Sequence, residues 1–105
     1  KATLEELEEA DLLLHVLDAS DAAVPHHKAA VDEVLADLGL DDTEQMLVWN
    51  KADVADAGFL HQLVSDHGGR PVSATTGEGL EELLSVVEQH LFRQRTRADV
   101  AELHP

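Results

Sequence analysis

The sequence predicts an α/β fold, a three-layer sandwich in which helices cover a sheet of parallel strands. Apolar runs of strand length alternate along the chain with segments whose apolar residues recur at helical spacing. Each apolar run ends in polar residues, as strands of open α/β sheets do where they approach a ligand. Right-handed crossovers through the intervening helices would keep these strands parallel.

Capping residues and apolar periodicity predict the helices. A first helix is expected to begin at Thr3, which can act as its N-cap. Pro25 suits the first turn of a second helix, and Gly39 closes it. A third helix is expected over residues 57–67 and a fourth over residues 78–92, where leucines and valines recur at i, i+3 and i+4.

Apolar runs over residues 11–18, 46–49 and 70–73 predict the strands. The first run is nearly continuous between two acidic residues, a pattern typical of a strand that is buried on both faces. His15 lies within it and is expected to be a hydrogen-bonded core residue. With 105 residues, the chain forms one domain at most.

The composition excludes several classes of function. The net charge of -15 argues against direct binding of nucleic acid or of an anionic membrane by this segment, since such surfaces need clustered Lys and Arg. The absence of cysteine excludes disulfides, thiolate metal sites and cysteine nucleophiles. No apolar run approaches the length that a membrane-spanning helix needs.

No residue is predicted to be catalytic or to bind a metal. His26 and His27 are adjacent and would point in different directions on a helix, while His61 and His67 are spaced wrongly for an i, i+4 metal pair. The serines lack the Gly-x-Ser-x-Gly elbow of a nucleophile. Asp18 ends an apolar strand as a magnesium ligand can, but a turn or cap role is favoured.

Polar residues after the second and third strands have the chemistry to recognise a guanine base. Asn50-Lys51-Ala52-Asp53 follows one strand and Ser73-Ala74-Thr75 follows the other. The Asp53 carboxylate can accept hydrogen bonds from both N1–H and the N2 amino group of guanine, a pair of donors that adenine lacks. The long apolar stem of Lys51 can cover one face of the base while its ammonium stays in water.

The other residues of the two segments would complete this site. Asn50 can tie its loop to the neighbouring strand and offer its amide to N7 of the base. The backbone N–H of Ala74 can donate to O6, and Ser73 can hydrogen-bond within its loop and support Asp53. The alternative is an ordinary turn between strand and helix, where Asn and Asp are common.

With those residues in place, the chain resembles the G domain of the HflX family of translational GTPases, part of the Obg-related group of P-loop GTPases. The resemblance covers roughly residues 2–92. Three segments carry it: ATLEELEEADLLLHVLDASD, LVWNKAD and PVSATTGEGLEELLSVVEQHL. The first segment distinguishes HflX proteins, since many GTPases share the other two.

The resemblance implies the C-terminal part of a G domain, a βαβαβα half, over residues 1–92, with a linker or the start of a further segment over residues 93–105. It implies binding of GTP or GDP, with Mg²⁺ in the intact protein only, and a cytoplasmic protein that acts on the large ribosomal subunit. Six residues of this chain would contact the nucleotide: Asn50, Lys51, Asp53, Ser73, Ala74 and Thr75. Many members carry Lys or Arg where Thr75 stands, so one face of the base would be covered less.

The sequence holds no G-x-x-x-x-G-K-[ST], and the family's phosphate loop, first switch and Asp-x-x-Gly turn, which would precede residue 2, are absent from it. Gly77-Glu78-Gly79 is expected to form a turn, because Glu78 would repel phosphate. As written, the chain is therefore expected not to hydrolyse GTP. It begins within a helical pattern, as an excised fragment of a GTPase would. A stand-alone, non-catalytic binding or interaction module is the alternative. The apolar edge that residues 12–17 would expose without a neighbouring strand favours the fragment, because natural proteins avoid such edges. The isolated chain is therefore expected to be marginally stable or to pair with itself through that edge.

Overall fold

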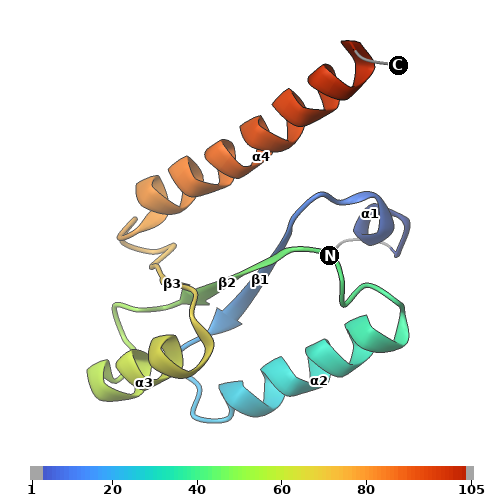
Figure 1. The fold of residues 1–105 in the computed structure, drawn as a ribbon. Coiled ribbons are helices and arrows are strands. Elements are labelled where there is room, and N and C mark those ends of the chain that lie inside the picture. Colours follow the sequence, from blue (N-terminus) through green and yellow to red (C-terminus); the bar gives the residue numbers. More distant parts are fainter. Residues whose placement is uncertain (1–3, 104–105) are drawn as a thin grey trace.

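In the computed structural model, which describes the backbone of residues 4–103 and the side chains of residues 4–93, strands alternate with helices (Figure 1). The three strands are parallel and lie in the order β1-β2-β3, which confirms the predicted α/β class. The elements are α1 Leu4–Glu9, β1 Leu13–Asp18, α2 Val24–Asp37, β2 Gln45–Asn50, α3 Ala57–His67, β3 Arg70–Pro71 and α4 Leu80–Leu103.

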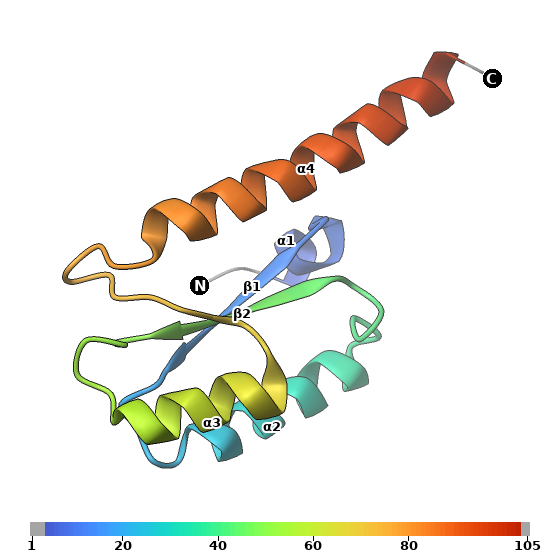
Figure 2. The ribbon, with the colours of Figure 1, turned by 60° about the vertical axis from the view of Figure 1, so that its left-hand side comes forward.

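Helices cover the two faces of the sheet, with α2 and α3 on one side and α4 on the other (Figures 1 and 2). On the first face, Leu17 of β1 and Trp49 of β2 pack with Leu63 of α3. On the opposite face, Val48 of β2 packs with Leu83 of α4. The sheet is thus the middle layer of the predicted three-layer sandwich.

The helix ends agree largely with the capping signals in the sequence. Pro25 occupies the first turn of α2, and the bounds of α3 are those predicted. The Asp56 side chain caps α3 by accepting a hydrogen bond from the Phe59 N–H at 2.8 Å. The last helix does not end at Phe92 but continues to Leu103. The predicted cap at Thr3 lies outside the described residues.

The predicted burial of the first strand on both faces is wrong. Leu13 and Leu17 are buried, but Leu14 and Val16 point to the other face and are 47% and 58% exposed. The reason is that α4 packs against β2 and against Val72, which directly follows β3, while β1 lies at the edge of the described sheet. Apolar residues on this face of β1 are therefore left uncovered within the described part of the chain.

The hydrogen bond expected at His15 is also missing. Both of its ring nitrogens are buried, and neither has a hydrogen-bond partner among the described residues. Burial lowers the pKa of His15, although the nearby Asp32 carboxylate partly opposes this. Burial of the ring nitrogens therefore favours the neutral form of the imidazole.

The exposed edge of β1 leads to a prediction about association of the 105-residue chain. We expect the chain to self-associate at high concentration, because exposed Leu14 and Val16 border a strand whose outer edge has no partner among the described residues. Val16→Lys should shift the chain towards monomer in light scattering. Val34→Lys is the matched control, since Val34 is similarly exposed (54%) but lies on α2. A stable monomer of the unchanged chain would contradict the prediction.

Candidate functional site

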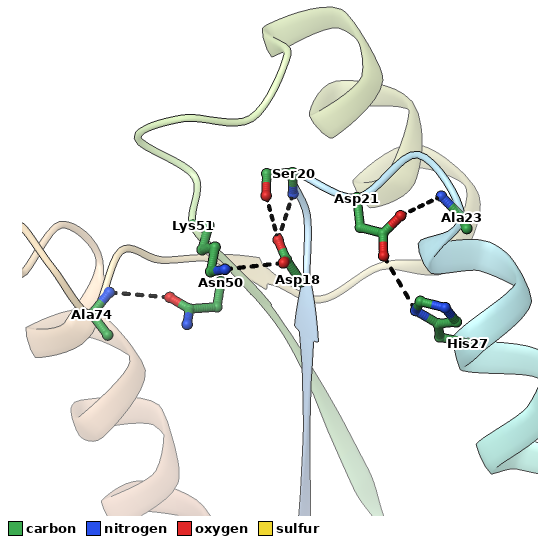
Figure 3. A network of polar contacts seen from close by, with 8 residues as sticks. All are labelled: Asp18, Ser20, Asp21, Ala23, His27, Asn50, Lys51 and Ala74. Carbon is green, nitrogen blue, oxygen red and sulfur yellow. Dashed lines mark hydrogen bonds and ion pairs between the residues drawn. The ribbon is translucent and has the colours of Figure 1, made fainter.

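The carboxyl ends of the strands bring the predicted site residues to one edge of the sheet (Figure 3). Asp18 at the end of β1 is in register with Asn50 at the end of β2, and the Ala19 N–H donates to the Asn50 carbonyl at 2.9 Å. β3 ends at Pro71, and Val72 alone separates the strand from Ser73. This edge is where open α/β sheets bind ligands.

Backbone hydrogen bonds fix the loop that follows β2. Lys51 has a φ of 65°, in the left-handed region that residues other than glycine seldom adopt. Its carbonyl accepts hydrogen bonds from the N–H groups of Val54 and Ala55, at 3.1 and 3.0 Å. The Ala52 N–H donates to the Val72 carbonyl at 2.9 Å, which ties the loop to the next strand. Asp53 lies in the resulting turn with an exposed side chain.

Asn50 joins the two loops, as the sequence predicts. Its Oδ1 accepts a hydrogen bond from the Ala74 N–H at 3.1 Å (Figure 3). The same bond changes the role expected of Ala74, because an N–H that already donates to Asn50 is not free to donate to O6 of a base. Ala74 could reach a base oxygen only by sharing or exchanging this bond.

Ser73 shapes the loop from within. It is fully buried, and its Oγ accepts a hydrogen bond from the Thr76 N–H at 3.1 Å. Its N–H donates to the Glu78 carbonyl, and its own carbonyl accepts from the Gly77 N–H. Hydrogen bonding within the loop is thus confirmed, whereas no hydrogen bond joins Ser73 to Asp53 among the described residues. Thr75 lies exposed on the same loop.

Asp18 also lies at this edge of the sheet, where it contacts Lys51, a contact that the sequence does not reveal. Its Oδ1 accepts hydrogen bonds from the Ser20 hydroxyl at 2.6 Å and from the Ser20 N–H at 2.9 Å, which confirms the predicted turn role. Its Oδ2 accepts from the Lys51 Nζ at 3.1 Å. The Ser20 and Lys51 hydrogen bonds lower the pKa of Asp18, so the carboxylate stays charged.

The assembled edge offers acceptors and donors suited to a flat polar ligand. The Asp53 carboxylate is an exposed acceptor, and the Asn50 amide nitrogen, whose oxygen accepts from Ala74, remains available as a donor. Within the described side chains, no group of three or more His, Asp or Glu residues is placed to hold a metal ion. Over residues 4–103, no helix combines the length and the apolar character that crossing a bilayer demands.

Comparison with known proteins identifies the relatives of the chain. No family model matches it. The chain is 44% identical over 96 residues to the GTPase HflX of Lacrimispora saccharolytica, a match that covers 90% of this chain and 22% of the relative. It is 40% identical over 101 residues to the GTPase HflX of Magnetococcus marinus, covering 95% of this chain and 23% of that protein.

A third curated relative, the GTPase HflX of Escherichia coli, is 36% identical over 95 residues and matches 87% of this chain. In each case the chain spans between a fifth and a quarter of the relative's length, 22% for the Escherichia coli protein. The likeness therefore concerns one part of these GTPases and nearly the whole of this chain. Along the residues that it spans, the chain belongs to the GTPase HflX family.

Proposed function

We propose that this chain carries the guanine-recognising half of the nucleotide site of an HflX-like GTPase. The observation that carries the proposal is the hydrogen bond between Asn50 Oδ1 and the Ala74 N–H. This bond joins the loop that holds Lys51 and Asp53 to the loop that holds Ser73 and Thr75. A base between these loops would meet a carboxylate, an amide and an aliphatic stem together.

Each residue has a role in this proposal that follows from its chemistry. Asp53 accepts both N1–H and the N2 amino group of guanine, while Asn50 offers its amide nitrogen to N7. The stem of Lys51 covers one face of the ring. Ser73 holds the loop that places Ala74 near O6, and the Ala74 N–H shares or exchanges its bond with Asn50 when the base arrives. Thr75 lines the site with a short side chain.

In the intact protein we propose GTP binding and hydrolysis with Mg²⁺, in the cytoplasm, on the large ribosomal subunit, where stalled or idle ribosomes are split. Residues outside this chain would hold the phosphates, the metal ion and the attacking water, since phosphoryl transfer depends on positioning those groups. The acidic chain, with its net charge of -15, would not itself bind ribosomal RNA.

Because this chain would contact the base and other residues would contact the phosphates, the proposal predicts how nucleotide affinity depends on the phosphates. The 105-residue chain alone should bind GDP weakly or undetectably in calorimetry, and guanosine no worse than GDP, because it offers contacts to the base only. The protein encoded by the complete open reading frame should bind GDP far more tightly than guanosine, and neither adenosine nor ADP should compete. Micromolar binding of GDP by the chain alone would contradict the proposal.

The coding DNA upstream of Lys1 provides a second, independent test. An open frame that encodes G-x-x-x-x-G-K-[ST] and Asp-x-x-Gly would supply the phosphate-binding parts that the proposal requires. A start codon directly before Lys1 would contradict hydrolysis by this protein.

A further inference from the structure

We infer that Asp18 is a positioning residue of the base site, which holds the Lys51 side chain in place over the bound base. The inference rests on the proposed function, because it concerns how the lysine of that site is oriented. It adds a residue from β1 to a site whose other members lie at the end of β2 or after β2 and β3.

The two oxygens of the Asp18 carboxylate have separate partners. Oδ1 accepts both hydrogen bonds from Ser20, which fixes the carboxylate in the turn after β1. Oδ2 is thereby directed at the Lys51 Nζ, 3.1 Å away (Figure 3). The carboxylate is thus held by its own turn before the lysine reaches it.

The backbone of Lys51 complements this arrangement. Its left-handed conformation, with a φ of 65°, sets the direction in which the side chain leaves β2, and the ion pair with Asp18 fixes the far end. A lysine anchored at both ends crosses from β2 to β1 at the carboxyl edge of the sheet. Its aliphatic stem therefore lies where the proposed base would stack.

The pair should affect ligand affinity more than folding. The Lys51 and Asp18 side chains are 53% and 39% exposed, and ion pairs at such exposed positions contribute little to stability. A free lysine side chain, however, loses considerable rotamer freedom when a ligand orders it. Because Asp18 orders the side chain in advance, its removal should weaken GDP binding by about two- to fivefold.

The test is a double-mutant cycle in the protein expressed from the complete open reading frame, with GDP binding measured by calorimetry. Asp18→Asn keeps an acceptor for Ser20 but removes the charge, and Lys51→Met keeps the stem but removes the ammonium. Each change alone should weaken GDP binding by about two- to fivefold, and the double variant should bind no more weakly than either. At about 1 M salt, Asp18→Asn and the unchanged protein should bind alike, because the exposed pair is screened.

Asp21→Asn is the matched control. Asp21 lies in the same turn region, but its carboxylate accepts from the Ala23 N–H and faces His27, not Lys51 (Figure 3). This variant should bind GDP as the unchanged protein does. Fully additive losses in the Asp18 and Lys51 variants, or an equal loss in Asp21→Asn, would overturn the inference. If Asp53→Asn also left the guanine preference unchanged, the proposed function itself would fail; otherwise only the inference would.

Discussion

Asp53→Asn, in the protein expressed from the complete open reading frame, is expected to exchange a preference for guanine nucleotides for a preference for xanthine nucleotides. The carboxylate accepts two donors of guanine, whereas an amide presents one donor and one acceptor. Xanthine carries an oxygen where guanine carries its N2 amino group, and the amide N–H can donate to that oxygen. A polar site left with unpaired groups rejects the wrong ligand strongly, so affinity for GDP should fall by about 100-fold or more.

Competition between GDP and XDP for the same protein measures this exchange. Asp56→Asn is the matched control, because Asp56 lies near Asp53 and caps α3 through the Phe59 N–H. Asparagine is as good an N-cap as aspartate, so this variant should keep both its fold and its guanine preference. Guanine preference that survives Asp53→Asn would remove the base-site assignment.

The fold could be predicted from the sequence in most of its elements, because each element has a local signal. The end of α3, for example, follows from Gly68 and Gly69 directly after its last residue. The exposure of Leu14 and Val16 could not be predicted in the same way. An apolar run indicates that its side chains favour burial, but it does not indicate which element of the fold covers each of them. That depends on α4 packing over β2 and Val72, which is a long-range property.

The candidate site likewise contains residues that the sequence indicates and contacts that only the folded structure reveals. Asn50, Lys51 and Asp53 stand out in the sequence because their chemistry and spacing are local. The link from Lys51 to Asp18 spans 33 residues and depends on the parallel register that sets Asp18 beside Asn50. The bond from Asn50 to the Ala74 N–H, across 24 residues, likewise changes the role of Ala74 in a way that composition does not indicate.

Gly69→Ala is expected to be among the most destabilising single substitutions in this chain. A Cβ at Gly69 would lie 2.7 Å from the Leu47 Cβ and 2.8 Å from both the Leu47 carbonyl oxygen and the Trp49 Nε1. These atoms belong to β2 and to a fully buried indole, so they cannot move aside cheaply. The φ of 94° adds strain of its own. Together these effects should cost about 3 kcal/mol or more of the free energy of unfolding.

Gly68→Ala separates the two causes, because Gly68 also has a positive φ, 73°, but no atom lies within 4 Å of its Cβ position. It should cost only the backbone strain, about 1–3 kcal/mol, because its φ of 73° and ψ of -159° lie in a region that is essentially restricted to glycine. Urea unfolding of the 105-residue chain, followed through its single tryptophan, Trp49, compares the two. Equal losses would contradict the contact argument. Since Trp49 directly precedes Asn50, a β2 displaced by Gly69→Ala should also shift the start of the base-site loop, whereas Gly68→Ala should leave it in place.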